Sequence, residues 1–498
     1  MAVPGNEGRA SGLARGTLTT IDAVAISVTV LAPGMAMLLN VPGVAAVAGG
    51  STPLAFLLGG LACLALAVVV VGFTRRMAAA GYAYTYISRS LGRTTGFVAG
   101  WLYAFGVMCF VPMTMAGVAY LASDLLHLGP SWWFPLFLLG MALLVALSIV
   151  RIKVTTRLQL AVGAVTVVVI VIVNAVVTAK GGAQGNTAAP FTFAHTEKGG
   201  FAGVFYGIIL GITSYIGFET AADFGEETAN PRRSIPIAVV ASVAFAMVFY
   251  LWTTYSLAIG FGVNNGATFG GDSFALKTIA ERFVGAPLAA LIEVGALMSA
   301  FLVCVGCTTA ASRTLFAMGR EGALPTWLGR THHRFHTPAN ATVTIAVLGT
   351  VLAAVVGFGL GAGDLGGAAI TVYYFFATLG TLAVITVYIG LCIGGMVFFR
   401  RIRDRYSVVA HLWVPATGVV LFGAALVGSV YPAPTAPLNL TPYITVAVVL
   451  VGVVVVAFLR IRRPDAVQRI GTILGEEGRE IAVFSPQVPG PDQGHDHR

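Results

Sequence analysis

The sequence predicts an all-α polytopic membrane protein with twelve transmembrane helices. Hydrophobic residues make up 57% of its 498 residues and charged residues only 10%, whereas about a quarter of the residues in a typical soluble protein are charged. Apolar runs such as 54–73, 161–179 and 443–459 approach or reach the roughly 20 residues that cross a hydrocarbon core. Lipid admits only helices or closed barrels, and these runs are too long for barrel strands.

The expected spans follow one another along the chain, separated by polar loops. They cover residues 21–47, 52–73, 96–121, 132–149, 158–178, 202–222, 235–259, 287–316, 339–358, 368–399, 411–430 and 442–459. Spans one to ten are expected to form one core, with spans one to five at 21–178 and spans six to ten at 202–399. Spans eleven and twelve occupy 411–459, and residues 1–20 and 460–498 are expected to be cytoplasmic segments.

The net charge of +9 follows the loops between the spans. With the N-terminus inside, only Lys180, Lys198, Lys277 and Arg282 of the 29 Lys and Arg residues lie outside. Short cytoplasmic loops carry such an excess of positive charge, so both termini are expected to be cytoplasmic. The excess of basic residues therefore reflects the orientation of the chain in a lipid bilayer, and no nucleic-acid partner is expected.

Two polar segments between spans are expected to be helical without crossing the membrane. Residues 81–92 (GYAYTYISRSLG) predict an interfacial helix with its three tyrosines near the lipid headgroups. On the outer side, residues 273–282 have helical spacing of apolar side chains. This segment is either a gate across the external mouth or an ordinary surface loop, and the sequence favours neither.

Span one is expected to be interrupted at Ala32-Pro33-Gly34. Pro33 has no amide hydrogen and presses against the carbonyl of Thr29, and Gly34 leaves helical geometry at little cost. A proline kink is common in membrane helices, so this break indicates a functional site only if a second break accompanies it.

Span six carries the second interruption, next to an acid. It contains Gly211 and Gly217, and Glu219 and Asp223 follow the apolar run 201–216. A carboxylate at the bilayer centre costs about 2.5–3.5 kcal/mol even on the gentlest insertion scale, so it usually faces a cavity or a partner. Paired interruptions at corresponding positions of two halves indicate the substrate site of a transporter.

Three stretches agree in order and spacing with one known family. They read GFE (217–219), GEET (225–228) and NPRRSIP (230–236) around span six, LG…GF…GW (91–101) at span three, and SR…AMGREGALP (312–325) after span eight. In these stretches the chain resembles the amino acid–polyamine–organocation (APC) superfamily of permeases. The resemblance covers spans three to eight, and the remaining spans agree by hydropathy.

The resemblance implies a five-plus-five inverted repeat, with spans one and six broken and two extra helices, working by alternating access. It places substrate against Ala32, Pro33, Gly34, Met35, Tyr215, Ile216, Gly217, Phe218 and Glu219. Broken helices leave unpaired amides that attract a carboxylate and unpaired carbonyls that attract a cation, so a zwitterion fits. Tyr373 and Tyr374 of span ten either add an aromatic wall or serve only as packing.

Glu219 is the candidate for coupling, because a buried acid can load and release a proton between states. Alternatively, it is a permanently protonated acid that only holds the break. Asp223 belongs to the inner vestibule, and Glu226, Glu227 and Arg232 form either an inner gate of salt bridges or a solvated turn.

The chain departs from the family at two places. Many members carry Gly-Ser-Gly-Ile in span one, where this chain has Ala32-Pro33-Gly34. Some proton-coupled members hold a lysine in span five, where this chain has no basic residue. Oxygen atoms that offer a cage for sodium are the hydroxyls of Thr308 and Thr309 and the carbonyls near Val28 and Leu31.

The sequence therefore predicts a secondary active transporter that moves an amino acid across the cytoplasmic membrane, with protons as the expected coupling ion. The alternatives are a polyamine or small-amine permease or exchanger, and a ligand sensor that does not transport. No enzyme activity, cofactor or structural metal is expected, because no nucleotide-binding loop or His-Glu metal motif occurs.

Overall fold

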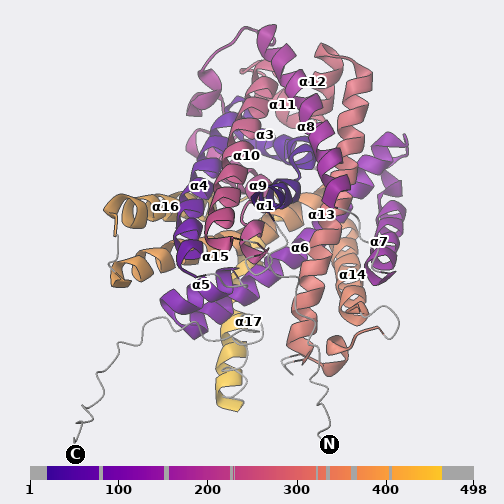
Figure 1. The fold of residues 1–498 in the computed structure, drawn as a ribbon. Coiled ribbons are helices and arrows are strands. Elements are labelled where there is room, and N and C mark those ends of the chain that lie inside the picture. The colour runs from indigo at the N-terminus through magenta and orange to yellow at the C-terminus, as the bar shows by residue number, and fades with distance from the viewer. Residues whose placement is uncertain are drawn as a thin grey trace, which may run out of the picture.

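The computed structural model describes residues 19–77, 82–150, 156–224, 228, 230–320, 324–332, 337–360, 367–402 and 406–462. Every regular element among these residues is a helix (Figure 1), which confirms the all-α class. In this part of the chain, ten helical segments are long and apolar enough to cross a membrane. The first, Thr20–Arg76, joins expected spans one and two, and Phe201–Tyr215 is a shorter apolar helix. The count of twelve spans stays a prediction.

The first span is broken where the sequence places the break. α1 (Thr20–Leu31) ends at Ala32, whose φ of 44° and ψ of 60° are left-handed. A helix restarts with Pro33 as its first residue, a position where the missing amide hydrogen has no partner to lose. The restarted part consists of α2 (Pro33–Met35), the π-helix η1 (Ala36–Asn40) and α3 (Val41–Ala48).

The other elements follow in chain order. The long helices are α4 (Thr52–Arg76), α6 (Arg93–Leu125), α7 (Trp133–Val150), α8 (Thr156–Ala179), α10 (Pro231–Phe261), α13 (Ala286–Arg320), α14 (Ala339–Ala354), α15 (Ala368–Ile402), α16 (Val414–Gly428) and α17 (Thr441–Arg462). The shorter elements are α5 (Tyr82–Leu91), α9 (Phe201–Tyr215), the 3-10 turn η6 (Thr220–Phe224), α11 (Gly266–Gly271) and α12 (Ala275–Phe283).

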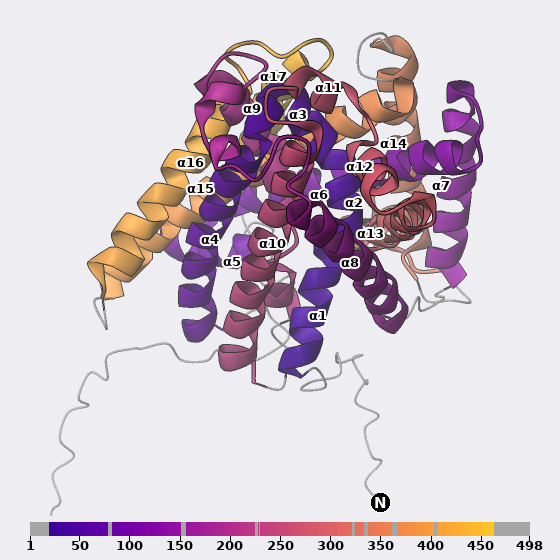
Figure 2. The same ribbon diagram turned by 90° about the horizontal axis from the view of Figure 1, so that it is seen from above.

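The two broken segments lie inside a bundle of long helices. α1 packs against α10 (Figure 2), and α9 packs against α3, α4 and α15. α15 runs along α6, and α13 packs against both α6 and α2. The interior between them is closed by side chains such as Tyr250, Tyr373 and Tyr388, none of which is exposed.

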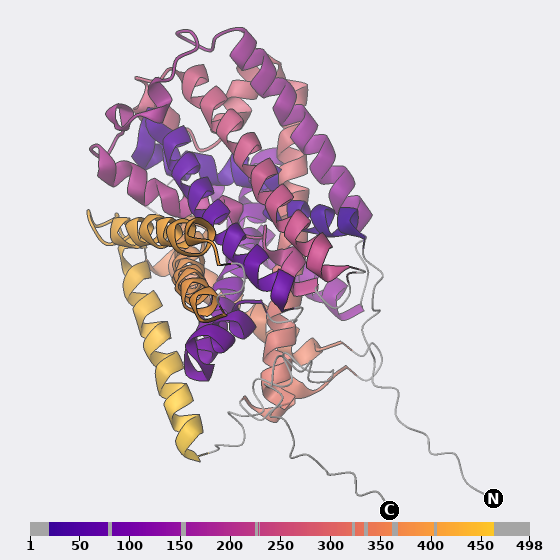
Figure 3. The ribbon, with the colours of Figure 1, turned by 60° about the vertical axis from the view of Figure 1, so that its left-hand side comes forward.

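Helices at the periphery present apolar side chains outward. α16 and α17 lie on one flank of the bundle (Figure 3), and α7 and α14 pack against each other at another. Leu139 of α7, Val420 of α16 and Val454 of α17 are 67%, 68% and 65% exposed. Such extended apolar surface is rare on soluble monomers and is expected where a helix faces lipid.

α5 is helical as predicted, and two of its three tyrosines are buried against other helices. Tyr82 and Tyr86 are only 1% exposed, because α5 packs into the bundle against α6 and α15. The close approach requires Gly96, where a Cβ atom would collide with Ser88. The glycine of the span-three motif is therefore explained by helix packing.

Candidate functional site

The two helix breaks face each other in the interior of the bundle. α9 ends at Tyr215, and Gly217 then adopts a φ of 115°, which favours glycine. A Cβ atom on Gly217 would lie 2.7 Å from Cγ1 of Val30 and 3.3 Å from the amide nitrogen of Leu31. The last turn of α1 before its own break therefore touches the break in span six.

Hydrogen bonds join the two broken segments on both sides of this contact. Asn40, in the π-helix, donates from Nδ2 to Oγ of Ser214 at 2.9 Å. The amide of Ala221, in η6, donates to Oγ of Ser27 in α1 at 3.1 Å. Both bonds are buried, so the broken segments are held together by polar contacts away from water.

Span ten and α10 extend this polar network. The hydroxyl of Tyr373 donates to Oδ1 of Asn40 at 2.8 Å, and that of Tyr374 donates to the carbonyl of Leu39 at 3.0 Å. The hydroxyl of Tyr250 contacts the carbonyls of Ser214 at 2.9 Å and Leu31 at 3.3 Å. Leu31 is the last residue of α1, so its carbonyl is one that the helix leaves unpaired.

Glu219 lies at the centre of the break and is fully buried. Its Oε2 atom accepts a hydrogen bond from the amide of Gly217 at 3.0 Å, and Oε1 accepts from the hydroxyl of Tyr388. The ring of Tyr388 in turn lies 6.5 Å from that of Phe218. The carboxyl group thus accepts a hydrogen bond from a backbone amide just beyond the end of α9.

The other predicted substrate residues lie around these breaks, with different neighbours. Ala32, Pro33, Gly34 and Met35 are buried, and Gly34 faces Thr166 of α8. Tyr215 turns toward α4, where its hydroxyl donates to the carbonyl of Phe56 at 3.1 Å. Ile216, between Tyr215 and Gly217, is half-buried.

Among the described residues, no hydrogen bond connects one predicted sodium ligand to another. The hydroxyl of Thr309 donates to the carbonyl of Val305 at 2.8 Å, and the carbonyl of Leu31 accepts from Tyr250. The hydroxyl of Thr308 is buried and has no nitrogen or oxygen partner among the described residues. Val28 lies in α1, one turn before the break.

The predicted inner gate falls mostly on residues outside the described ones. Glu226 and Glu227 lie outside the described residues, as does the side chain of Asp223, whose backbone is in η6. Arg232 is exposed at the start of α10. Near it, the hydroxyls of Ser234 and Thr20 are 2.8 Å apart and join α10 to the first turn of α1.

The sequence reasoning missed the side chains that make these polar contacts, which are Ser27, Asn40, Ser214, Tyr250 and Tyr388. Asn40 carried a usable signal, because a polar amide inside an apolar span needs an internal partner. Tyr250 and Tyr388 stand in apolar runs with other aromatic residues, and nothing local separates them from packing residues.

The apolar helices and the two facing breaks define a multi-pass helical membrane protein. The family model described as amino acid permease matches residues 18–457, and the chain belongs to this family. This agrees with the APC resemblance of the sequence.

Several named relatives share about a quarter of their residues with this chain. The branched-chain amino acid permease BcaP of Lactococcus lactis subsp. cremoris (strain MG1363) is 26% identical over 389 residues, which are 73% of this chain and 80% of the relative. The methylthioribose transporter of Bacillus subtilis (strain 168) is 26% identical over 76% of this chain and 80% of its own. The low-affinity putrescine importer PlaP of Escherichia coli (strain K12) is 25% identical over 82% and 88%. The names point to permease-type transport rather than to catalysis.

Proposed function

We propose that this protein is a secondary active transporter that moves an amino acid across the cytoplasmic membrane by alternating access, coupled to protons. The observation that supports this best is the contact of Gly217 with Val30 and Leu31, which brings two helix interruptions face to face in the middle of the bundle. Helix interruptions of this kind supply backbone groups for a polar cargo at the membrane midplane.

The proposed topology has twelve spans in a five-plus-five inverted repeat, with two extra helices and both termini cytoplasmic. Residues 21–178 and 202–399 form the two halves, and residues 411–459 hold spans eleven and twelve. Residues 1–20 and 460–498 are the cytoplasmic segments. The excess of Lys and Arg on one side of the expected spans supports this orientation.

In the proposed mechanism, the Glu219 carboxyl group makes the hydrogen bond that the carboxylate of the cargo makes once it binds. Its Oε2 atom takes the amide of Gly217, which is the kind of helix-end donor that attracts a carboxylate. Cargo that binds this amide displaces Glu219, and the freed carboxylate then takes up a proton. Because Pro33 supplies no amide, the span-one break contributes carbonyl oxygens for the cargo ammonium.

A small-amine or polyamine cargo is the second candidate. One relative is named as a putrescine importer, and the buried side chains include two acids, Glu219 and Glu293. A cargo without a carboxylate would leave the Gly217–Glu219 bond in place. A ligand sensor that does not transport would show binding without uptake.

Uptake into proteoliposomes tests the proposal. Labelled branched-chain and other amino acids, monoamines and diamines are offered with and without pH and sodium gradients. Concentrative uptake of an amino acid that requires an acidic exterior supports the proposal. Uptake of amines alone favours the second candidate, and binding without uptake of any compound would overturn transport.

A further inference from the structure

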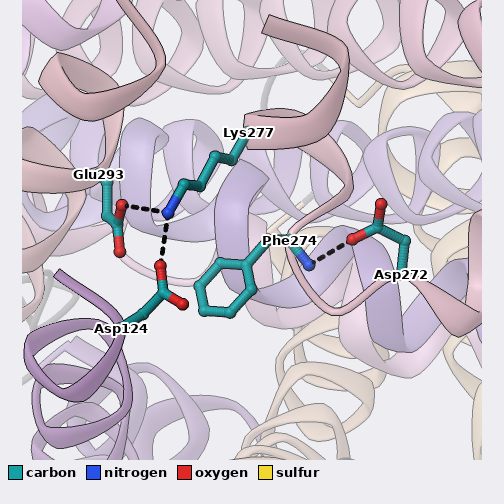
Figure 4. A network of polar contacts seen from close by, with 5 residues as sticks. All are labelled: Asp124, Asp272, Phe274, Lys277 and Glu293. Atoms are coloured by element: carbon teal, nitrogen blue, oxygen red, sulfur yellow. Dashed lines mark hydrogen bonds and ion pairs between the residues drawn. The ribbon is translucent and has the colours of Figure 1, made fainter. Parts of the chain in front are cut away.

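A cluster of charged side chains joins three helices at the α12 end of the bundle. The ammonium group of Lys277, in α12, contacts Oδ2 of Asp124 and lies 2.9 Å from Oε2 of Glu293 (Figure 4). Asp124 lies in the last turn of α6, and Glu293 lies in α13. One primary ammonium group therefore bridges two carboxylates from two different spans.

One carboxylate oxygen of the cluster accepts no hydrogen bond from Lys277. The side chain of Glu293 is 2% exposed, and its Oε1 atom has no hydrogen-bond partner among the described residues. A buried carboxylate oxygen without a donor is costly, so Oε1 of Glu293 can accept from a further N–H group. Two carboxyl groups share the one ammonium group of Lys277.

Aromatic side chains complete the surroundings of the ammonium group. The ring of Phe274 lies 5.4 Å from Nζ of Lys277 and stacks on Tyr120 of α6, with ring centroids 4.9 Å apart. Aromatic faces attract alkylammonium groups. Two carboxylates and an aromatic wall together suit a primary ammonium carried on an alkyl stem.

Lys277, which supplies the ammonium group, lies on the short helix α12 and not on one of the long apolar helices. α12 has nine residues and packs onto α13 through one apolar face, with Leu276 and Ile279 buried. The carboxylates, in contrast, belong to long spanning helices. A displacement of α12 would withdraw Lys277 and leave both acids in place.

We propose that Asp124 and Glu293 form an outer binding site for the primary ammonium group of the cargo, which Lys277 occupies as a tethered surrogate while α12 covers the site. The inference rests on the proposed transport function and on the orientation that places α12 outside. Incoming cargo competes with Lys277, and its binding favours the displaced position of α12. The site thus selects cargo that bears a free amino group before it reaches the breaks.

Chemical rescue of Lys277→Ala tests the site on the purified full chain, without any transport step. n-Butylammonium is the probe, and tetramethylammonium at the same concentration is the control, because it has the same charge but no N–H donor. We expect n-butylammonium to bind Lys277→Ala roughly ten-fold more tightly than the wild type, the ratio that corresponds to about 1.4 kcal/mol. The gain should be lost in Lys277→Ala/Glu293→Gln and absent from Lys198→Ala, which removes an exposed lysine outside α12.

Titration calorimetry in nanodiscs measures the affinity, and the thermal midpoint gives a second readout. If Lys277→Ala is unstable alone, it is purified in n-butylammonium, and stability that this amine alone restores supports the site. Equal affinity of wild type and variant, equal effects of both cations, or a gain that persists with Glu293→Gln would each overturn the proposal.

A competition arm connects the site to the cargo. The compound that the uptake assay identifies should displace n-butylammonium from Lys277→Ala, and its N-acetylated form should not. Displacement by both forms, or by neither, would contradict recognition of the cargo ammonium here. Because rescue requires no uptake, a wild type that transports nothing would refute the proposed function and leave the rescue result interpretable.

Discussion

Both oxygens of the Glu219 carboxyl have hydrogen-bond donors, one from the backbone of the break and one from Tyr388. Such a group can act in transport only if the conformational cycle exchanges these donors for others. In the proposed mechanism a cargo carboxylate replaces the bond to Gly217, whereas the bond to Tyr388 ties the acid to α15. We therefore propose coupling for Glu219 and positioning for Tyr388.

Replacement of Glu219 tests the coupling role. In Glu219→Gln the side-chain oxygen can still accept from Gly217, but the group no longer gains or loses a proton. We expect uptake that does not depend on the pH gradient, measured as initial rates in proteoliposomes. Asp272→Asn, at an acid that accepts from the amide of Phe274, should keep the dependence. Proton-driven uptake that is unchanged in Glu219→Gln would remove this residue from coupling.

Asn40 provides one of the two hydrogen bonds described above between the broken spans. Asn40→Ala leaves the Tyr373 hydroxyl without its acceptor in a buried place and removes the bond that Ser214 accepts, although Ser214 still donates to the carbonyl of Leu210. We expect a loss of about 1–3 kcal/mol in unfolding free energy, seen as a lower thermal midpoint in detergent. Asn340→Ala, which removes an exposed bond to the carbonyl of Trp327, should have a much smaller effect. Equal losses in Asn40→Ala and Asn340→Ala would show that the buried hydrogen bonds do not account for the loss of stability.

At the scale of helices, the interruption in span six depends on the backbone of Gly217. Gly217→Ala places a Cβ atom against Val30 and forces a side chain into a positive φ, which costs of order 1–3 kcal/mol. We expect the two breaks to separate and cargo uptake to fall to a small fraction of the wild-type rate. Gly163→Ala, in α8, meets open space and should transport normally. Normal uptake by Gly217→Ala would contradict the role of this contact.

The attachment of α12 has a defined dependence on pH. Partial burial lowers the pKa of Lys277, but its bonds to Asp124 and Glu293 outweigh this, and the net pKa is raised. A raised pKa means that the ion pair stabilises the fold fully below the ordinary lysine pKa of about 10.4 and loses this effect above it. The thermal midpoints of wild type and Lys277→Met should therefore differ while both acids are ionised and Lys277 is charged, and should converge as the pH rises through the raised pKa of Lys277. A difference that persists unchanged above that pKa would contradict this.

For the whole molecule, the sequence predicted those features that have local causes. The break at Ala32 follows from Pro33, and the break at Gly217 follows from a glycine at a positive φ. The exposed valines of α16 and α17 agree with lipid-facing helices. These features need no knowledge of distant partners.

The composition of the site could not be predicted, because its bonds join residues far apart in the chain. Tyr373 lies 333 residues from Asn40, and Tyr388 lies 169 residues from Glu219. Many tyrosines in the apolar runs have similar surroundings in the sequence, and only the fold selects those that reach a break. The buried position of α5 depends in the same way on its packing against α15.

Protection of the break by cargo is the measurement that tests the central claim most directly. Ile216→Cys is made in a full-length chain whose native cysteines are replaced by alanine, and its labelling by a thiol reagent is followed in proteoliposomes. The cargo that the uptake assay identifies should slow this labelling in a saturable way, with half-protection near its KM. Labelling of Asn186→Cys, in an exposed loop, should not change. If cargo that is transported leaves the labelling of Ile216→Cys unaltered, the cargo does not bind between the two broken helices.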